Sequence, residues 1–505
     1  MRTKNVIRNI LASVGSYAVL FFLNILVRKC FLFKFDVELL GYEGLFGSIF
    51  LILSIAEMGA NSMFDYMLYE ALAKKDMDQL GVIMDMYKKL YRIIGVIVLI
   101  LGGLVYFILP FVITDDVSDW GFVRTIYLIQ LGGTLITYFL AYRRALFAAD
   151  QKSYLITKID TIYKFVSSAF RIGAILLISN YIVYLTVPVI TNLLSNIRIS
   201  SLTKKSYEGI FSHKANWNDF KEKNAFFQLK NLIVHKISTV VYNTSDNFII
   251  STILGMTTMG LYSNYQMLTA ALSQMLLFFT GAIGSSTGNL MHSESQEKKL
   301  EFYYIIDFIS FLIGLFCMVE MVVCFQKTVI FLYGNEYLLA DIIPFILGVN
   351  FYVNCRGIGY GCLQGSVGHY ETVRNYSIMS AFLNVFFSIL FGLKYGIAGV
   401  LSATIIGNCF IQAGRAAVVF SWLFIDIKKR EIIKEVIFFG VACLISFVLK
   451  RLFDMMGANP ISIIFCLIAT FLCVIVFVVV LFRRSKTFRL VLNYASGVVD
   501  VFKRN

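Results

Sequence analysis

Long apolar segments recur throughout this chain, and charged residues lie inside or beside many of them. Segments such as Val96–Leu109, Phe308–Val323 and Ile461–Leu481 are each apolar enough to sit in a bilayer. A charge near the centre of a membrane-spanning helix costs about 2.5–3.5 kcal/mol on insertion scales. The charges in question are Arg28, Glu57, Lys164, Arg171, Lys236, Asp246, Glu320, Arg356 and Arg415. Such charges require a shared polar cavity, partners or a route to the interface, which predicts a membrane protein that moves something polar.

Composition excludes a soluble enzyme. The 505 residues are 58% hydrophobic and only 15% charged, whereas soluble domains carry about 25% charged residues. The net charge of +14 comes from basic residues in short loops, which indicates membrane topology rather than nucleic-acid binding. The nine cysteines show no zinc-ligand spacing and are interpreted as small packing residues. We therefore predict no metal, no catalytic residue and no cofactor.

A spanning helix needs about 20 mostly apolar residues, and about fourteen such windows predict an all-α polytopic membrane protein. The windows are 10–31, 40–64, 91–113, 121–142, 155–178, 181–200, 231–254, 259–287, 303–326, 340–365, 375–394, 397–424, 433–453 and 461–482. The predicted organisation is a six-helix bundle over 1–200, a basic cytoplasmic linker over 201–230, a second six-helix bundle over 231–425, and a further helix pair with a basic tail over 426–505.

The distribution of Lys and Arg predicts the orientation. With the first residue in the cytoplasm, about 32 of these residues fall in cytoplasmic loops and about 8 in outer loops. Both termini are therefore expected in the cytoplasm. The first residues lead directly into a long apolar span without a small-residue cleavage site, which predicts a retained first helix.

A short repeat supports the division into two bundles. Leu39–Phe46 resembles Thr258–Tyr265, and each segment follows one span and opens the next. The glycines of the two segments, Gly41 and Gly260, are 219 residues apart. That offset is close to half of a twelve-helix core, as expected for parallel transporter repeats.

Polar residues recur at helical spacing within six of the spans. They are Ser13, Tyr17, Asn24 and Arg28; Ser54, Glu57 and Asn61; Asp160, Lys164, Ser168 and Arg171; His235, Thr239, Tyr242 and Asp246, with Lys236, Asn243 and Asn247 beside them; Ser377, Ser380, Asn384 and Ser388; and Thr404, Asn408, Gln412 and Arg415. Hydroxyls and amides in such rows commonly bond helices together. Charged members are functional candidates by default.

The cations come from both halves of the chain and suit an anion such as a phosphate or diphosphate, because guanidinium groups bind oxygens in pairs. The predicted substrate-binding residues are Arg28, Arg171, Lys236, Arg356, Arg415, Asn24, Asn243, Asn408 and Gln412. Arg28 is equally open to a snorkelling role at the interface. The acids Asp246 and Glu57 either pair structurally with a cation or titrate with a coupling ion.

Several motifs carry a family resemblance. They are Thr3–Asn5 with Arg8–Ile10, Leu40–Phe46, Leu53–Gly59, Tyr87–Lys89 with Tyr91–Gly95, His235–Ser238, Thr244–Asn247 and Gly260–Tyr265. Together they resemble a lipid-linked oligosaccharide flippase of the bacterial polysaccharide transporter family, in the multidrug/oligosaccharidyl-lipid/polysaccharide (MOP) exporter superfamily. The similarity runs over nearly the whole chain and is strongest in 1–100 and 228–292.

The resemblance implies two six-helix bundles that alternate between inward-facing and outward-facing states in the bacterial plasma membrane. The implied cargo is an undecaprenyl-diphosphate-linked repeat unit of capsule, O-antigen or another surface polysaccharide. It also implies a cationic cavity for the diphosphate and coupling to a proton or sodium gradient. Expected partners are the lipid-linked oligosaccharide, the bilayer, a polysaccharide polymerase and chain-length machinery, but no nucleic acid.

Two other functions stay open. A membrane polysaccharide polymerase or glycosyltransferase usually carries catalytic groups on a long external loop, whereas the outer loops here are short. The pair Asp115 and Asp116, after the third span, is the only acidic pair that resembles a metal site, and a solvated turn is the preferred interpretation. A multidrug exporter of the same superfamily is expected to line its cavity mainly with acids and aromatic rings, whereas cations predominate inside these spans.

Overall fold

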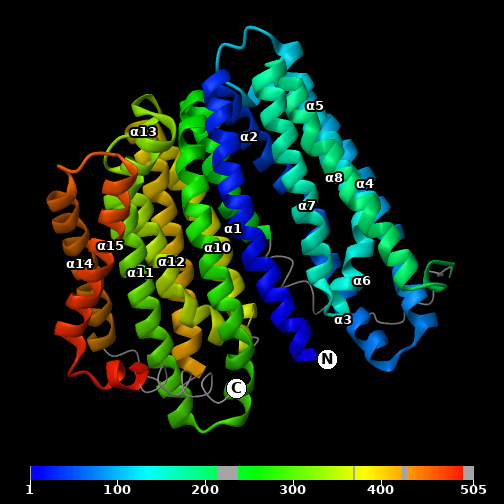
Figure 1. The fold of residues 1–505 in the computed structure, drawn as a ribbon. Coiled ribbons are helices and arrows are strands. Elements are labelled where there is room, and N and C mark those ends of the chain that lie inside the picture. The colour runs from blue at the N-terminus through cyan, green and yellow to red at the C-terminus, as the bar shows by residue number, and fades with distance from the viewer. Residues whose placement is uncertain (1, 213–236, 368–369, 423–428, 493–505) are drawn as a thin grey trace. The chain divides into compact units, whose positions relative to one another are not determined.

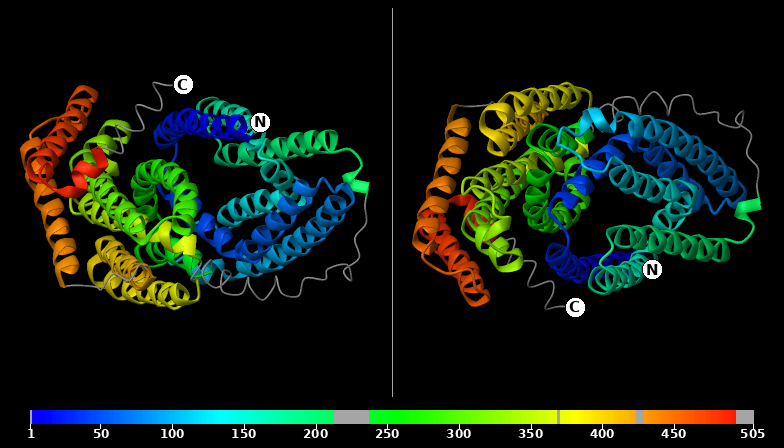
Figure 2. Two further views of the ribbon diagram at one scale, coloured as in Figure 1. Left: turned by 90° about the horizontal axis from the view of Figure 1, so that it is seen from below. Right: turned by 90° about the horizontal axis from the view of Figure 1, so that it is seen from above.

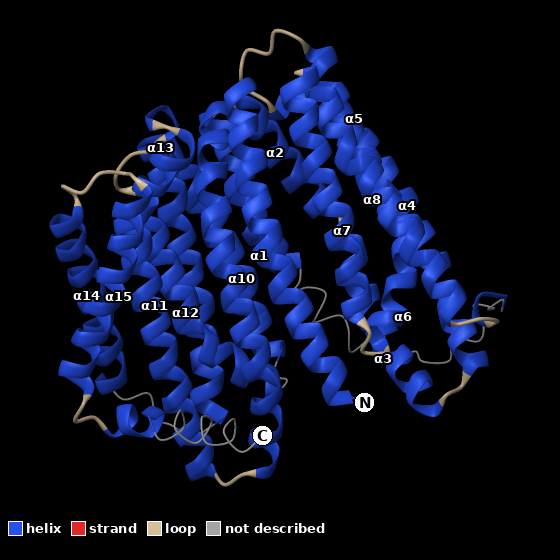
Figure 3. Cartoon of the chain, in the orientation of Figure 1, coloured by secondary structure: helices blue, strands red, loops and turns tan. Residues whose placement is uncertain are grey.

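The computed structural model describes residues 2–212, 237–367, 370–422 and 429–492. Over these ranges the chain is helical, with loops between the helices (Figures 1 and 3). The helices are α1 (Arg2–Lys34), α2 (Glu38–Leu53), α3 (Ile55–Lys74), α4 (Met77–Val112), α5 (Trp120–Leu140), α6 (Arg144–Ala149), α7 (Ser153–Gly173), α8 (Tyr181–Ser206), α10 (Met256–Ser293), α11 (Gln296–Tyr333), α12 (Ile343–Val367), α13 (Tyr370–Trp422), α14 (Lys429–Phe453) and α15 (Pro460–Phe482). Residues 237–249 form a further helix, which continues as a π-helix over Ile250–Leu254. The predicted all-α fold is confirmed.

Nine helices within the described ranges are long and apolar enough to cross a membrane. The remaining predicted spans coincide with helices that are broken or richer in polar residues. The window 40–64 divides into α2 and α3 at Ser54. The windows 375–394 and 397–424 share α13, which kinks at Gly396, where φ is +62°. Only glycine adopts that backbone conformation without strain, so this glycine separates the two spans.

The chain forms two compact units, Met1–Gly260 and Leu261–Asn505. In the N-terminal unit α7 packs between α1 and α8, α5 packs on α8, and α4 packs on α3 and α5. Figure 2 shows α1 beside α7. The core of this unit is rich in aromatic side chains, including Phe31, Tyr127 and Tyr184, all fully or almost fully buried. Most of the predicted linker 201–230 lies outside the described residues.

Within the N-terminal unit, each of the two repeat glycines packs against the segment that leads to the other glycine. A Cβ atom on Gly41 would clash with the backbone carbonyl of Met256, and a Cβ atom on Gly260 would clash with that of Val37. Val37 and Met256 each stand four residues before a repeat glycine, so the contact is reciprocal. The start of α2 and the start of α10 therefore pack backbone against backbone, which explains why both repeats carry glycine.

An acidic loop residue fixes the beginning of α10. Asp115, which follows α4, accepts a hydrogen bond through Oδ2 from the backbone N–H of Met256 at 2.6 Å. Thr114 donates to the carbonyl of Thr252 at 2.7 Å. A carboxylate at a helix N-terminus satisfies an N–H group that has no partner within the helix. Asp115 is thus a helix cap rather than half of a metal site.

In the C-terminal unit α11 is the central helix. It packs against α12, α14 and α15, and α12 packs on α13. Its buried side includes Phe311, Leu315 and Met318, which share one apolar cluster with residues of the C-terminal helix pair. The Phe311 ring packs against Phe438 and Phe482 of that pair. The pair α14–α15 therefore belongs to the core of this unit.

Candidate functional site

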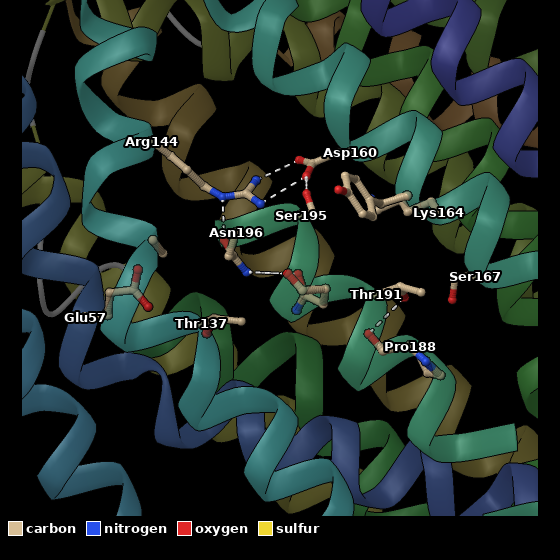
Figure 4. Close-up of a pocket in the computed structure, with 13 residues that line it drawn as sticks. Glu57, Thr137, Arg144, Asp160, Lys164, Ser167, Pro188, Thr191, Ser195 and Asn196 are labelled. Carbon is tan, nitrogen blue, oxygen red and sulfur yellow. Dashed lines mark hydrogen bonds and ion pairs between the residues drawn. The ribbon is translucent and has the colours of Figure 1, made fainter. Parts of the chain in front are cut away.

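A cavity of about 590 Å³ lies within the N-terminal unit (Figure 4). It is enclosed by α3, α5, the start of α6, α7 and α8. This volume falls in the range of small-molecule sites, about 300–1,000 Å³. Its polar lining consists of Glu57, Thr137, Arg144, Asp160, Tyr163, Lys164, Ser167, Thr191, Asn192, Ser195 and Asn196. A chamber so polar inside a unit of membrane-spanning helices is the strongest candidate site.

A bidentate ion pair forms one wall. The guanidinium of Arg144 donates from Nη1 to Asp160 Oδ2 at 2.7 Å and from Nη2 to Oδ1 at 3.0 Å. The Arg144 Nε donates to Asn196 Oδ1 at 2.8 Å, and the Ser195 hydroxyl donates to Asp160 Oδ1 at 2.6 Å. Arg144, Asp160 and Ser195 point toward one another in Figure 4. Paired N–H bonds of this kind fix orientation as well as charge.

Helical spacing explains how the lining comes together. On α7, Asp160, Lys164 and Ser167 follow one another at intervals of four and three residues, which places them on one face. On α8 the pair Asn192 and Asn196 has the same spacing, and the Asn196 amide donates to Asn192 Oδ1 at 3.1 Å. Two adjacent helices thus turn their polar faces to the same space.

The position of α7 is fixed at its first turn and along its length. Asn9 on α1 accepts a bond from the backbone N–H of Tyr154 at 2.7 Å and donates to the carbonyl of Gln151 at 3.2 Å. The hydroxyls of Ser16 and Thr161 lie 2.5 Å apart. Helix α1 therefore caps and aligns the helix that carries Asp160.

Glu57, the predicted acid of the second span, lies in the wall of this cavity. The hydroxyl of Tyr91 donates to its Oε1 at 2.5 Å. Tyr138 interacts with the same carboxylate. Two tyrosines on α4 and α5 therefore hold Glu57 at the edge of the chamber.

The predicted cations Arg28 and Arg171 lie outside the cavity lining, at a tyrosine of α8. The guanidinium carbon of Arg171 is 4.3 Å from the centre of the Tyr184 ring, and Arg171 donates a hydrogen bond to the Tyr184 hydroxyl. Glu43 and Arg28 act electrostatically on the same hydroxyl. Asn24 is exposed on α1. The structure thus brings Arg28 and Arg171 together but separates them from the chamber.

Arg356 lies in a buried ion-pair cluster of the C-terminal unit. It donates from Nη2 to Asp307 Oδ1 at 2.5 Å and from Nε to Glu435 Oε2 at 3.0 Å. Lys434 lies 3.3 Å from Asp307 Oδ2. The cluster joins α11, α12 and α14, so the contacts of Arg356 are those of a residue that connects helices.

The predicted residues of the twelfth span form a row on α13. Asn408 donates to Asn350 Oδ1 at 2.9 Å, Gln412 donates to Asn408 Oδ1 at 3.1 Å, and Arg415 donates to Gln412 Oε1 at 3.3 Å. Asn408 and Gln412 are buried, whereas Arg415 is half-buried. The row therefore reaches from α12 to the Arg415 guanidinium.

The remaining predicted residues lie on the helix before α10 or just ahead of it. Asp246 is buried and Asn243 is exposed. Lys236 lies outside the described residues. Within the part of the chain that the structure describes, no group of three or more His, Cys, Asp or Glu side chains could hold a metal ion.

Solved structures share this arrangement of helices. The lipid II flippase MurJ, in an inward closed conformation, is 16% identical over 94% of this chain and 98% of its own, with a TM-score of 0.64. An inward-facing multidrug resistance MATE transporter of the MOP superfamily is also 16% identical, over 80% of this chain and 93% of its own, with a TM-score of 0.62. The chain has the fold that these two proteins share.

A MOP superfamily transporter from Pyrococcus furiosus, described as having a binding pocket of reverse polarity, has a TM-score of 0.54. It is 16% identical over 84% of this chain and 95% of its own. No protein-family model and no curated protein sequence matches the chain. The predicted resemblance is therefore confirmed for the fold.

The sequence-based prediction includes only three of the eleven polar lining residues, Glu57, Asp160 and Lys164. Arg144 falls in a predicted cytoplasmic loop, and Asn192, Ser195 and Asn196 belong to none of the predicted polar rows. The spacing of Asn192 and Asn196 in an otherwise apolar span is the signal that could have revealed them. The pairing of Arg144 with Asp160 has no such signal, because 16 residues and a turn separate them.

Proposed function

We propose that this chain is a flippase that moves an undecaprenyl-diphosphate-linked oligosaccharide from the cytoplasmic to the outer leaflet by alternating access. The observation that carries the proposal is the polar, charged chamber around Arg144 and Asp160 within a membrane-spanning unit. A saccharide head group needs such a chamber, while its lipid tail can stay in the bilayer. The fold shared with a lipid II flippase supports this choice.

The proposed setting is the bacterial plasma membrane, with both termini in the cytoplasm and the product used for capsule, O-antigen or another surface polysaccharide. A polymerase and chain-length machinery would take up the product. The diphosphate is proposed to interact with cations of the predicted set, Arg28, Arg171, Lys236 and Arg415, together with Asn24, Asn243, Asn408 and Gln412. Glu57 and Asp246 are proposed to couple transport to a proton or sodium gradient.

A multidrug exporter is the second candidate. MATE transporters share the fold, and two carboxylates, Glu57 and Asp160, line the chamber. A cationic drug would interact with those acids. An enzyme has less support, because Asp115, from the acidic pair of the outer loop, caps α10.

Transport in liposomes tests the proposal. The full chain is reconstituted with a fluorescent undecaprenyl-diphosphate oligosaccharide, and the fraction of labelled head groups exposed outside is followed with a membrane-impermeant quencher. The flippase predicts an exposed fraction that rises with time and requires the protein. Uptake of a cationic dye by the same liposomes without movement of the lipid-linked oligosaccharide would favour the exporter.

A further inference from the structure

The charges that line the chamber balance one another. Two cations, Arg144 and Lys164, face the space together with two carboxylates, Asp160 and Glu57. An anion that enters meets both carboxylates, so the attraction of the cations is offset. Charge alone therefore gives this chamber no preference for a diphosphate.

The guanidinium of Arg144, the group in the chamber best suited to bind an anion, already donates its hydrogen bonds to other side chains. A phosphate is bound most strongly by the paired N–H groups of a guanidinium. At Arg144 the Nη1 and Nη2 pair is directed at Asp160, and Nε is directed at Asn196. Both members of the ion pair are three-quarters buried, with 24% of each side chain exposed. A diphosphate would have to displace a buried carboxylate to bind this guanidinium.

The rest of the lining suits groups that both donate and accept hydrogen bonds. It supplies the hydroxyls of Tyr163 and Ser167 and the amide of Asn192. The hydroxyls of Thr137 and Thr191 donate to backbone carbonyls of their own helices and so offer acceptors. Hydroxyl and amide side chains offer donors and acceptors in one group, whereas phosphate oxygens only accept. Sugar hydroxyls match such a surface in both roles.

A separate cation site lies farther along α7. Arg171 follows Asp160 by 11 residues, which is about 16 Å of helix. Its Nε has no hydrogen-bond partner within the described ranges. Glu43 and Arg28 act on the same tyrosine as Arg171, so two cations face one carboxylate there. The same helix therefore carries the neutral chamber in one part and a cationic cluster in another.

We propose that the chamber binds the uncharged saccharide residues of the cargo, and that the diphosphate binds outside it. This inference rests on the proposed flippase function. It assigns recognition of the sugar to the polar faces of α7 and α8. The residues that select the saccharide are then different from the cations that attract the diphosphate.

Binding to the purified full chain in nanodiscs tests the inference. One probe is the uncharged oligosaccharide released by mild acid from the cell's own lipid-linked intermediates, and the other is inorganic pyrophosphate. The variants are Asn192→Ala and Thr137→Val in the chamber and Arg171→Gln outside it. Loss of one neutral hydrogen bond predicts roughly threefold to tenfold weaker oligosaccharide binding for each chamber variant. Arg171→Gln should weaken pyrophosphate binding, and the control Lys298→Ala, at an exposed ion pair, should leave oligosaccharide binding unchanged.

The reverse pattern would overturn the inference. It fails if pyrophosphate binding falls in Asn192→Ala and Thr137→Val, or if the wild-type chain does not bind the oligosaccharide at millimolar concentration. It also fails if both chamber variants fold normally and bind the oligosaccharide as the wild type does. The liposome assay separates these outcomes from the parent proposal, because a chain that moves the lipid-linked oligosaccharide remains a flippase wherever its sugar binds.

Discussion

Replacing Arg356 by methionine should destabilise the C-terminal unit rather than remove a cargo contact. Only 7% of the Arg356 side chain is exposed, and the substitution leaves Asp307, with 5% exposed, and Glu435 without their main cation. Removing one partner from a buried ion pair costs about 3–5 kcal/mol. Lys434, at 3.3 Å from Asp307, compensates part of that loss. We therefore expect a cost of about 3 kcal/mol.

Thermal unfolding in detergent checks this expectation. For a unit of this size 1 kcal/mol corresponds to roughly 2 °C or more, so Arg356→Met should unfold at least about 6 °C below the wild type. Adding Asp307→Asn and Glu435→Gln should recover much of the loss, because the unpaired charges are removed. Lys298→Ala, which breaks an exposed pair with Glu294, is the matched control and should shift unfolding by little.

The opposite result would refute this reasoning. If Arg356→Met unfolds at the wild-type temperature and nevertheless abolishes transport, the arginine acts on the cargo and not between helices. The sequence-based assignment of Arg356 to substrate binding would then stand.

Four further substitutions have clear expectations. Gly41→Ala and Gly260→Ala should each lower the unfolding temperature, because the added methyl group meets backbone carbonyls. Gly47→Ala is the control: its Cβ position has open space, so the substitution should be neutral or stabilising by up to about 1 kcal/mol. Equal behaviour of all three variants would contradict the reciprocal packing. Asp115→Ala should cost about 1 kcal/mol through loss of the α10 cap, measured by chemical unfolding and hydrogen exchange at residues 256–259. Unchanged exchange protection there would argue against the cap.

The sequence predicts most of the helices, but it does not predict which helices pack against one another. The length of an apolar segment determines whether it can form a membrane-spanning helix, so most of the predicted windows correspond to observed helices. Periodicity also indicates which residues share a face, as with Asp160 and Lys164 on α7. It does not say which other helix that face meets, and for this reason Arg356 was grouped with cavity cations although its partners are Asp307 and Glu435.

The repeat glycines show a case in which sequence and structure inform each other. Their offset indicated duplication, and the structure supplies the physical reason for glycine at both positions, a reciprocal backbone contact. Arg144 shows the opposite case. Its position in a loop suggested topology alone, whereas its bidentate bond to Asp160 makes it part of the chamber wall.

Photo-crosslinking of the cargo locates the sugar-binding site. A lipid-linked oligosaccharide that carries a photoreactive group on its sugar is incubated with the reconstituted full chain, irradiated, and the labelled peptides are identified by mass spectrometry. A sugar site in the chamber predicts labels on α7 and α8 between Asp160 and Asn196, and competition by the unlabelled oligosaccharide. Labels confined to other helices, with transport intact, would contradict the assignment of the chamber as the sugar-binding site.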